Sequence, residues 1–275
     1  MTRRVLITGV TGNLGVKAVA ALRALDDVKV IGIANQPARV DLGITVVFAD
    51  LSMPDTSWDR WFEGVDVVLH LAADPSPAAP WESIIANNID LSLNVLEAAH
   101  RHGVKRVVFA SSNWILAGYR FRSDPLTPAT PPLPVNAYGV SKLVIERAGE
   151  ALSRRGTDFL ALRIGWCQPG ENRPGSHMAF GRWGQQLWLS NADWTQAVQL
   201  ACIAPFEGFA VVNVMSDNAG SRWDLSDTHR LLGYSPTSQH RPKLTPRRYV
   251  TEAAARVRDR VFGGRTESPR FGARW

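Results

Sequence analysis

The chain opens with an apolar strand pattern that runs straight into a glycine-rich turn, and this segment constrains the fold most. Val5-Leu6-Ile7-Thr8 is followed by Gly9, Gly12 and Gly15, and Leu14 begins an Ala-rich helical pattern. A strand, a Gly-rich turn and a helix N-terminus form a cradle for phosphate, because the first N–H groups of a helix point at the anion. The segment therefore predicts the first βαβ unit of a dinucleotide-binding fold.

Strand-like and helix-like patterns then alternate through residues 1–165. Gly103 and Gly156 stand where two of the helices should end. Such alternation predicts an α/β protein with a Rossmann-type, doubly wound parallel sheet and right-handed crossovers. The expected strands are 4–8, 28–34, 44–48, 65–71, 106–111 and 158–164, and the main expected helices are 14–25, 81–102 and 136–155.

The pattern loosens after Gly165. It predicts that residues 1–165 form the dinucleotide-binding domain and that residues 166–240 form a small C-terminal substrate cap, interleaved with the last strands. The cap should lie over the carboxyl edge of the sheet, where ligands of such folds bind. Within it we expect a helix capped by Asn191 or Asp193, a strand at 209–214 and a short helix at 224–232. Residues 241–275 would form a basic tail with one helix at 251–262.

Positive charge is concentrated in this tail. Residues 241–275 hold ten Lys or Arg and three Asp or Glu, a net +7 against +6 for the whole chain. A solvated basic tail is the simplest interpretation, so no nucleic-acid partner is expected. Two cysteines, the absence of a signal pattern and the absence of a long apolar run predict a cytoplasmic protein that does not enter a membrane. No His, Cys, Asp and Glu cluster has metal-ligand spacing, so no metal is expected.

A second motif carries chemistry. Tyr138 and Lys142 form a Tyr-x-x-x-Lys pair that lies 26 residues after Ser112, at the end of an apolar strand pattern. Residues four apart share one face of a helix, so the ammonium would lie beside the phenol. We expect Lys142 to lower the pKa of Tyr138 toward working pH, with Tyr138 as acid/base and Ser112 holding the substrate oxygen. These residues predict transfer of a hydride and a proton at a C–O centre of a small molecule.

Together these segments resemble the extended short-chain dehydrogenases/reductases, the NAD-dependent epimerase/dehydratase superfamily. The resemblance covers nearly all of residues 4–240. It implies a homodimer and a catalytic role for Asn88, which stands where the family places a helix Asn that supports the proton relay. The matching segments are Thr8–Gly15, Asp50-Leu51, His70–Ala73, Asn88, Ser111-Ser112 and Tyr138–Lys142.

A closer likeness is to uronate dehydrogenases, which oxidise the anomeric carbon of galacturonate or glucuronate with NAD. In that group an Arg that follows Arg-Ile-Gly binds the sugar carboxylate, and Arg173 is the best match here. The segments that carry this likeness are Phe109–Asn113, Tyr138–Lys142, Arg163–Gly165 with Cys167, Trp223-Asp224 and Leu232–Tyr234.

The chain departs from that group at three places. Trp114 stands where the group has His, Trp166 stands where it has a small hydroxyl residue, and the acid expected for NAD is missing. Aromatic faces suit the C–H faces of sugars or flat apolar substrates. The expected substrate contacts are Ser76, Ser112, Asn113, Trp114, Trp166, Arg173 and His177.

The missing acid bears on the choice of cofactor. The second strand ends at Ala34 and is followed by Asn35 rather than by a carboxylate for the ribose 2′-OH. Arg39 could instead accept a 2′-phosphate, so NADP or NAD is expected, with a lean to NADP. The expected cofactor-binding residues are Gly9, Thr11, Gly12, Asn13, Leu14, Gly15, Asn35, Arg39, Asp50, Leu51, Leu71, Ala72, Ala73, Asn88, Ala110, Tyr138, Lys142 and Ile164.

The leading hypothesis is therefore an NAD(P)-dependent oxidoreductase that acts on a sugar, a sugar acid or a related polyhydroxylated compound. A carbonyl reductase of an aromatic or natural-product ketone is the second enzymatic interpretation, and a nucleotide-sugar epimerase is the third. A dinucleotide-sensing module without catalysis is the alternative from another class, and such modules commonly lack the Tyr–Lys pair.

Overall fold

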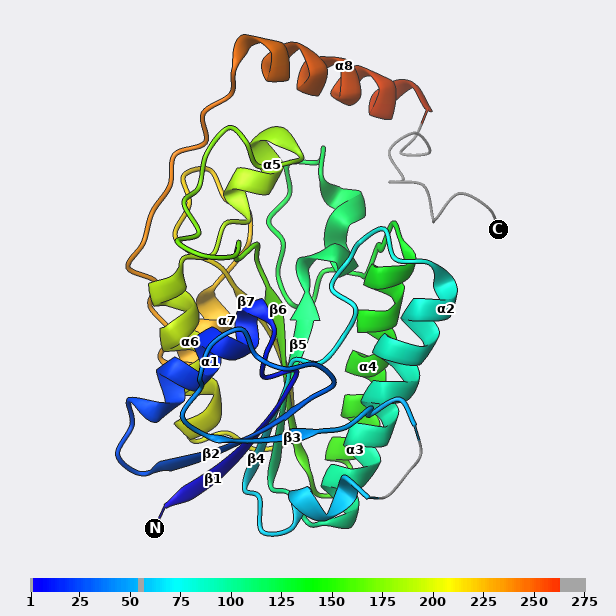
Figure 1. The fold of residues 1–275 in the computed structure, drawn as a ribbon. Helices are drawn as coiled ribbons and strands as arrows, with labels where there is room; N and C mark the ends of the chain where they lie inside the picture. Colours follow the sequence, from blue (N-terminus) through cyan, green and yellow to red (C-terminus); the bar gives the residue numbers. More distant parts are fainter. Residues whose placement is uncertain (1, 54–56, 263–275) are drawn as a thin grey trace.

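The computed structural model describes residues 2–53 and 57–262, and it contains one seven-stranded parallel sheet in the order β3-β2-β1-β4-β5-β6-β7 (Figure 1). This confirms the predicted Rossmann-type α/β fold, because the chain starts in the middle of the sheet, builds outward to β3 and then returns to build the other half. The strands are β1 (Arg3–Thr8), β2 (Val28–Ala34), β3 (Thr45–Phe48), β4 (Val67–His70), β5 (Arg106–Ser112), β6 (Asp158–Ile164) and β7 (Phe209–Val214).

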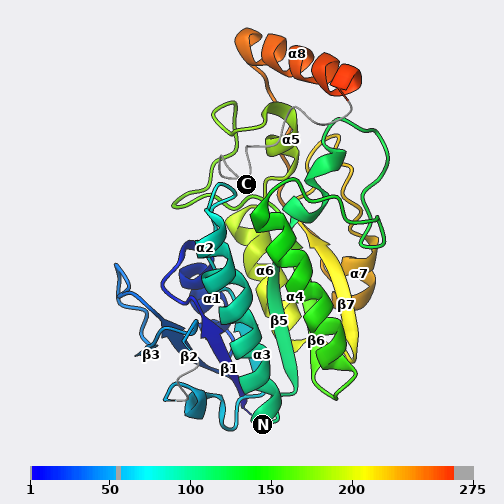
Figure 2. The same cartoon turned by 90° about the vertical axis from the view of Figure 1, so that its right-hand side faces the viewer.

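Helices cover both faces of the sheet. On one face α1 (Asn13–Arg23) packs against α6 (Asn191–Ile203), and their buried side chains form one hydrophobic core with the strands. On the other face α3 (Leu91–Arg101) packs against α4 (Ala137–Ser153) over a second core, and Figure 2 shows this pair in front of β5 and β6. Burial on both faces explains why the central strands read as continuous apolar runs.

The helix expected over 81–102 is interrupted. It begins as α2 (Trp81–Ile84), passes through a π-helical segment (Ile85–Asp90) and continues as α3. The i→i+5 bonds of a π-helix accommodate one extra residue in a turn, and such segments occur frequently at functional sites. Asn88 lies within this segment and is almost fully buried.

Some helix ends lie where the sequence predicts them, and others do not. Asn136 caps α4, since its side chain accepts a hydrogen bond from the Gly139 N–H at 2.8 Å. Gly233 ends α7 (Ser226–Leu232) with a left-handed φ of 74°. The predicted cap of α6 is wrong: Ser190, not Asn191 or Asp193, accepts from the Asp193 N–H at 2.9 Å. The sequence also predicts a short helix with Trp58, Trp61 and Phe62, capped by Asp55 or Thr56; a 3₁₀ segment covers Asp59–Phe62, and both caps lie outside the described residues.

Three further segments lie above the carboxyl edge of the sheet. They are a 3₁₀ segment (Asn113–Tyr119), α5 (Gly181–Gln186) and α8 (Pro246–Phe262). The first two were not expected from the sequence, and α8 begins five residues earlier than predicted. Figure 1 shows α8 lying over α5 at the end of the molecule opposite the N-terminus. Among the described residues, no helix combines the length and the apolar character needed to cross a bilayer.

Candidate active site

The glycine-rich turn forms a tight cradle between β1 and α1. Gly9 has a φ of 67°, and a Cβ there would lie 2.7 Å from the backbone nitrogen of Ala72. A Cβ on Gly15 would lie 2.3 Å from the Gly9 carbonyl oxygen. Two of the three glycines therefore allow backbone segments to approach one another as no larger residue would permit.

The start of α1 fits a dinucleotide pyrophosphate. Gly12 occupies the N-cap position, so no side chain caps this end, and there is no acidic residue in the first turn. Backbone N–H groups and the positive end of the helix dipole remain available to an anion. Asn13 lies at the same end and donates its side-chain amide to the Cys167 carbonyl at 2.9 Å, which ties the turn to the segment after β6.

The other expected cofactor positions follow the ends of neighbouring strands. Asn35 and Arg39 lie in an exposed segment after β2, where Arg39 could meet a 2′-phosphate. Asp50 follows β3 and accepts hydrogen bonds from the backbone and the hydroxyl of Ser52 at 2.9 and 2.7 Å. The remaining positions are Thr11 in the turn, Leu51 after β3, Leu71, Ala72 and Ala73 after β4, Ala110 in β5 and Ile164 at the end of β6.

Ser112, Tyr138 and Lys142 come together where β5 ends and α4 begins. The Ser112 hydroxyl is near enough to the Tyr138 phenol to lower the pKa of that phenol, and it accepts a hydrogen bond from the Trp114 N–H at 3.2 Å. The ammonium nitrogen of Lys142 lies 5.5 Å from the centre of the Tyr138 ring and 4.9 Å from that of Phe109. The three side chains that the sequence singled out are thus neighbours, with Ser112 and Lys142 buried and Tyr138 partly buried.

The expected lowering of the Tyr138 pKa is wrong for this structure. Burial raises the pKa of Tyr138 to about 12, against a lowering effect from the Ser112 hydrogen bond. Burial also lowers the pKa of Lys142 to about 7, so its positive charge is itself weakened by desolvation. The sequence pattern could predict the proximity of the pair but not its removal from water.

Asn88 joins the π-helical segment to the site. Its Oδ1 accepts from the Asp74 N–H at 2.8 Å, and its Nδ2 donates to Ser141 Oγ at 3.3 Å. Ser141 in turn donates to the Tyr138 carbonyl at 2.8 Å. Asn88, the predicted relay residue, is therefore connected to α4, the helix that carries Tyr138 and Lys142. A side-chain amide can both donate and accept hydrogen bonds, and Asn88 does both here.

The sequence analysis included His70 in a family segment without giving it a role, and it missed Asp74. His70 is fully buried at the end of β4, where Nδ1 lies 2.7 Å from Thr8 Oγ1 and Nε2 lies 2.9 Å from Ser92 Oγ. Burial, with the nearby Lys142, lowers the pKa of His70 to about 3, so the imidazole is neutral. The Asp74 carboxylate contributes to the raised pKa of Tyr138. Their places, His70 as the last residue of buried β4 and Asp74 in the loop that follows, were the available signal.

The predicted aromatic surface is present and contains one more residue. The Trp114 ring lies 5.3 Å from that of Phe180, edge to face, and the Trp166 ring lies 6.3 Å from Phe180. Trp166 follows β6, and Trp114 follows Ser112, so the group borders the carboxyl edge of the sheet beside the Tyr138 site. We call Trp114, Trp166 and Phe180 the aromatic wall. Phe180 was missed because its loop has no periodic pattern.

Other expected substrate residues are placed away from the site or engaged elsewhere. Arg173 is the clearest correction: its side chain is 82% exposed and forms a surface ion pair with Glu171 at 2.7 Å, so the structure gives no support for a carboxylate contact. His177 is exposed and bonds Gln168 Oε1 at 2.9 Å. Asn113 is buried and donates to the Ile164 carbonyl at 2.9 Å. Ser76 accepts from the Ala78 N–H at 3.2 Å, in the loop after β4.

A dinucleotide cradle beside a Ser–Tyr–Lys group defines a dinucleotide-dependent oxidoreductase, and the comparisons with known proteins agree. Residues 5–167 match the model of the NAD dependent epimerase/dehydratase family, and the chain belongs to this family. It is 34% identical to L-arabinose 1-dehydrogenase (NAD(P)(+)) of Haloferax volcanii, over 85% of this chain and 96% of the relative.

Two further similarities point the same way. The chain is 34% identical to uronate dehydrogenase of Pseudomonas syringae pv. tomato, over 85% of this chain and 81% of that protein. Its structure resembles the crystal structure of glucuronic acid dehydrogenase from Chromohalobacter salexigens with a TM-score of 0.74, at 29% identity over 87% and 86% of the two chains. The chain is thus an enzyme, an NAD(P)-dependent dehydrogenase of the short-chain dehydrogenase/reductase type.

Proposed function

We propose that this enzyme oxidises the anomeric carbon of a sugar with NADP or NAD, and that Tyr138 takes the hydroxyl proton. The observation that carries the proposal is the Ser112–Tyr138–Lys142 group at the carboxyl edge of the sheet, beside the aromatic wall. The relatives named for arabinose and uronate oxidation support a sugar as the substrate.

Each residue of the site has a separate role at the C–O bond that reacts. Ser112 holds the substrate oxygen, and the Tyr138 phenolate accepts its proton as the C–O bond gains double-bond character. A dinucleotide held by the glycine-rich turn at Gly9, Gly12 and Gly15 would supply the hydride acceptor, and the positive charge of its oxidised ring would favour the Tyr138 phenolate over the phenol. Asn88 and Ser141 hold the start of α4, so that Tyr138 keeps its place beside Ser112. In the reducing direction the phenol of Tyr138 returns the proton.

A neutral sugar fits this site better than a uronate. Arg173, the expected partner for a sugar carboxylate, is exposed and paired with Glu171. The aromatic wall offers apolar faces, and aromatic rings stack on the C–H faces of a pyranose. We therefore place a neutral aldose first and a uronate second.

The aromatic wall also favours a second candidate function, the reduction of an aromatic or natural-product ketone. Trp114, Trp166 and Phe180 bring three aromatic rings together, and flat apolar substrates also stack on such rings. The same Tyr138 and Ser112 would then protonate and hold the carbonyl oxygen.

Turnover assays separate these candidates. Purified enzyme is mixed with NAD or NADP and a panel of neutral aldoses and uronates, and NAD(P)H formation is followed by absorbance; aromatic ketones are tested with NADPH. We expect oxidation of at least one neutral aldose. Oxidation of uronates alone would restore the uronate assignment, and turnover of ketones alone would favour the second candidate.

We also propose a cytoplasmic homodimer that uses the faces of the π-helical segment, α3 and α4. Ile85, Leu93 and Val144 are large apolar side chains that remain exposed on these helices in the single chain. Burial of such side chains drives association, and the corresponding helices pair in many members of the family. Sedimentation of the purified protein tests the assembly, and a monomer would contradict it.

A further inference from the structure

Phe180 has a backbone conformation that a bulky residue rarely adopts. Its φ is 63° and its ψ is 16°, in the left-handed region, directly before α5. This conformation is unfavourable for residues with a Cβ and persists where surrounding contacts hold it, frequently at ligand-binding sites. Its ring nevertheless completes the aromatic wall between Trp114 and Trp166. Something must hold the backbone on both sides of Phe180.

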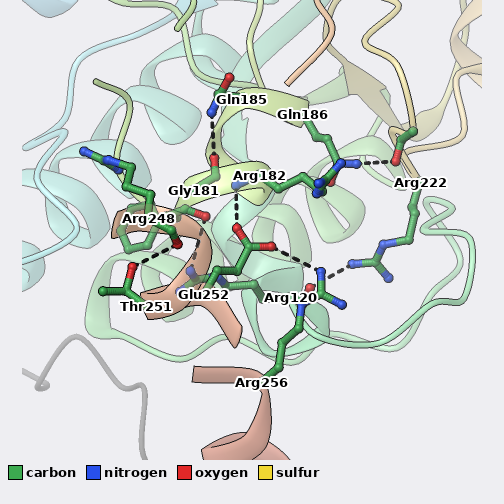
Figure 3. A network of polar contacts seen from close by, with 12 residues as sticks. Arg120, Gly181, Arg182, Gln185, Gln186, Arg222, Arg248, Thr251, Glu252 and Arg256 are labelled. Atoms are coloured by element: carbon green, nitrogen blue, oxygen red, sulfur yellow. Dashed lines mark hydrogen bonds and ion pairs between the residues drawn. The ribbon is translucent and has the colours of Figure 1, made fainter. Parts of the chain in front are cut away.

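Arg120 donates to the Phe180 carbonyl itself at 3.2 Å, and the C-terminal helix holds the backbone on either side of it. Before Phe180, Arg248 of α8 donates to the Met178 carbonyl at 2.6 Å and to the His177 carbonyl at 3.2 Å. After Phe180, Glu252 Oε2 accepts from the Arg182 N–H at 2.9 Å. Figure 3 shows Arg248 and Glu252 projecting from α8 toward the start of α5. One helical turn of α8 thus binds backbone groups on both sides of Phe180.

Glu252 is buried in this contact rather than solvated. Its side chain is 10% exposed, and a Cβ on Gly181 would lie 2.4 Å from Glu252 Oε2. Arg256, one turn later on α8, donates to the other carboxylate oxygen at 3.2 Å and is half exposed. A partly buried carboxylate that accepts a backbone N–H makes a charge-assisted bond, stronger than a neutral one.

We propose that Phe180 is a specificity-determining residue that contacts the sugar, and that Glu252 and Arg248 are positioning residues that act through Phe180. The basic C-terminal segment is then part of the substrate-binding apparatus: α8 holds the loop 177–182, and the loop holds the ring of Phe180 against Trp114 and Trp166. The inference rests on the proposed oxidation of a sugar, because the ligand of the aromatic wall is the C–H face of that sugar.

The test compares Glu252→Ala with two matched variants of the full chain. Glu252→Gln keeps an oxygen that can accept the Arg182 N–H, and Arg256→Ala removes only the exposed ion pair within α8. For Glu252→Ala we expect KM for the sugar to rise about tenfold, as for the loss of one charge-assisted bond, with little change in the Kd for NAD(P). Arg256→Ala should stay within about twofold of wild type, and Glu252→Gln, which keeps the acceptor but loses the charge, should raise KM less than Glu252→Ala does.

A double-mutant cycle tests whether Glu252 acts through Phe180. Phe180→Leu should raise KM by itself, and Glu252→Ala should add little in that background, because the two changes remove one interaction. Fully additive effects on KM, or an unchanged KM in Glu252→Ala, would overturn the proposal. An unchanged Kd for NAD(P) shows in each variant that the fold is intact.

Hydrogen exchange keeps this inference separate from the proposed function. Amide exchange of the peptide 177–187 needs no substrate, and it should speed up in Glu252→Ala and be restored in Glu252→Gln. If the wild type oxidises no sugar, the proposed function fails while the exchange result still decides whether α8 holds the loop. Unchanged exchange in Glu252→Ala would overturn the inference even if sugars are oxidised.

Discussion

Asn88 donates its side-chain amide to Ser141 Oγ at 3.3 Å, across the gap between the π-helical segment and α4. Ser141 is three residues after Tyr138 and bonds its carbonyl at 2.8 Å. A π-helical turn holds more residues than an α-helical turn, so it changes which side chains of the 81–102 segment face α4. The π-helical break in the helix is therefore linked, through Asn88 and Ser141, to the position of the acid/base Tyr138.

Tyr138→Phe should abolish turnover and leave cofactor binding largely intact. The phenol is the proton carrier, and general acid–base help is worth roughly 100- to 10,000-fold in kcat. Steady-state kinetics and titration of NAD(P) measure the two effects. Tyr119→Phe is the matched control, because Tyr119 only donates to the Pro131 carbonyl in a loop. A kcat near wild type in Tyr138→Phe would end the proposed mechanism.

Arg39→Ala should weaken NADP and leave NAD almost unaffected. No carboxylate follows β2, and a guanidinium–phosphate bond is worth about 1.5–3 kcal/mol, which corresponds to a rise in the Kd for NADP of roughly 10- to 100-fold. Titration of each dinucleotide into wild type and variant gives the comparison, with NAD as the internal control. Tight NAD binding without detectable NADP binding in the wild type would contradict the lean to NADP.

Arg173→Ala should leave KM for the sugar within about twofold of wild type. The side chain is 82% exposed and forms an exposed ion pair with Glu171, and such pairs contribute little. Arg173→Lys should behave in the same way, since no bidentate contact is lost. Phe180→Leu serves as the positive control for a change in KM. A marked rise in KM for Arg173→Ala would return a uronate to first place among the substrates.

His70 should make the protein less stable as the pH falls. Its folded-state pKa of about 3 lies below the ordinary value of 6.5, because burial disfavours the imidazolium. The contribution of His70 to the free energy of unfolding is therefore present above pH 6.5. It is lost as the pH falls toward 3, because the unfolded chain binds a proton that the folded chain does not. The slope contributed is about 1.4 kcal/mol per pH unit.

Urea unfolding between pH 4.5 and 6.5 measures this slope. His70→Gln removes the titrating group, so its free energy of unfolding should fall less steeply with acid than that of the wild type. His229→Gln, at an exposed position, is the control and should keep the wild-type slope. Equal slopes in wild type and His70→Gln would show that another group dominates the acid response.

The sequence by itself determined the features that depend on local pattern. The Gly-rich turn after a strand, the order of strands and helices and the spacing of Tyr138 and Lys142 all follow from short-range steric and hydrogen-bonding preferences. These were sufficient for the fold, for the family and for the proximity of Ser112 to Tyr138.

Only the tertiary structure decided what depends on distant partners. Burial, which no pattern measures, raised the pKa of Tyr138 and lowered that of Lys142. Arg173 was predicted from its place after Arg163-Ile164-Gly165, but its loop directs it to solvent and to Glu171. Phe180 and Glu252 are 72 residues apart in the chain, and their relationship exists only because α8 packs on α5. Desolvation and long-range packing are properties of the folded chain, and a local pattern does not encode them.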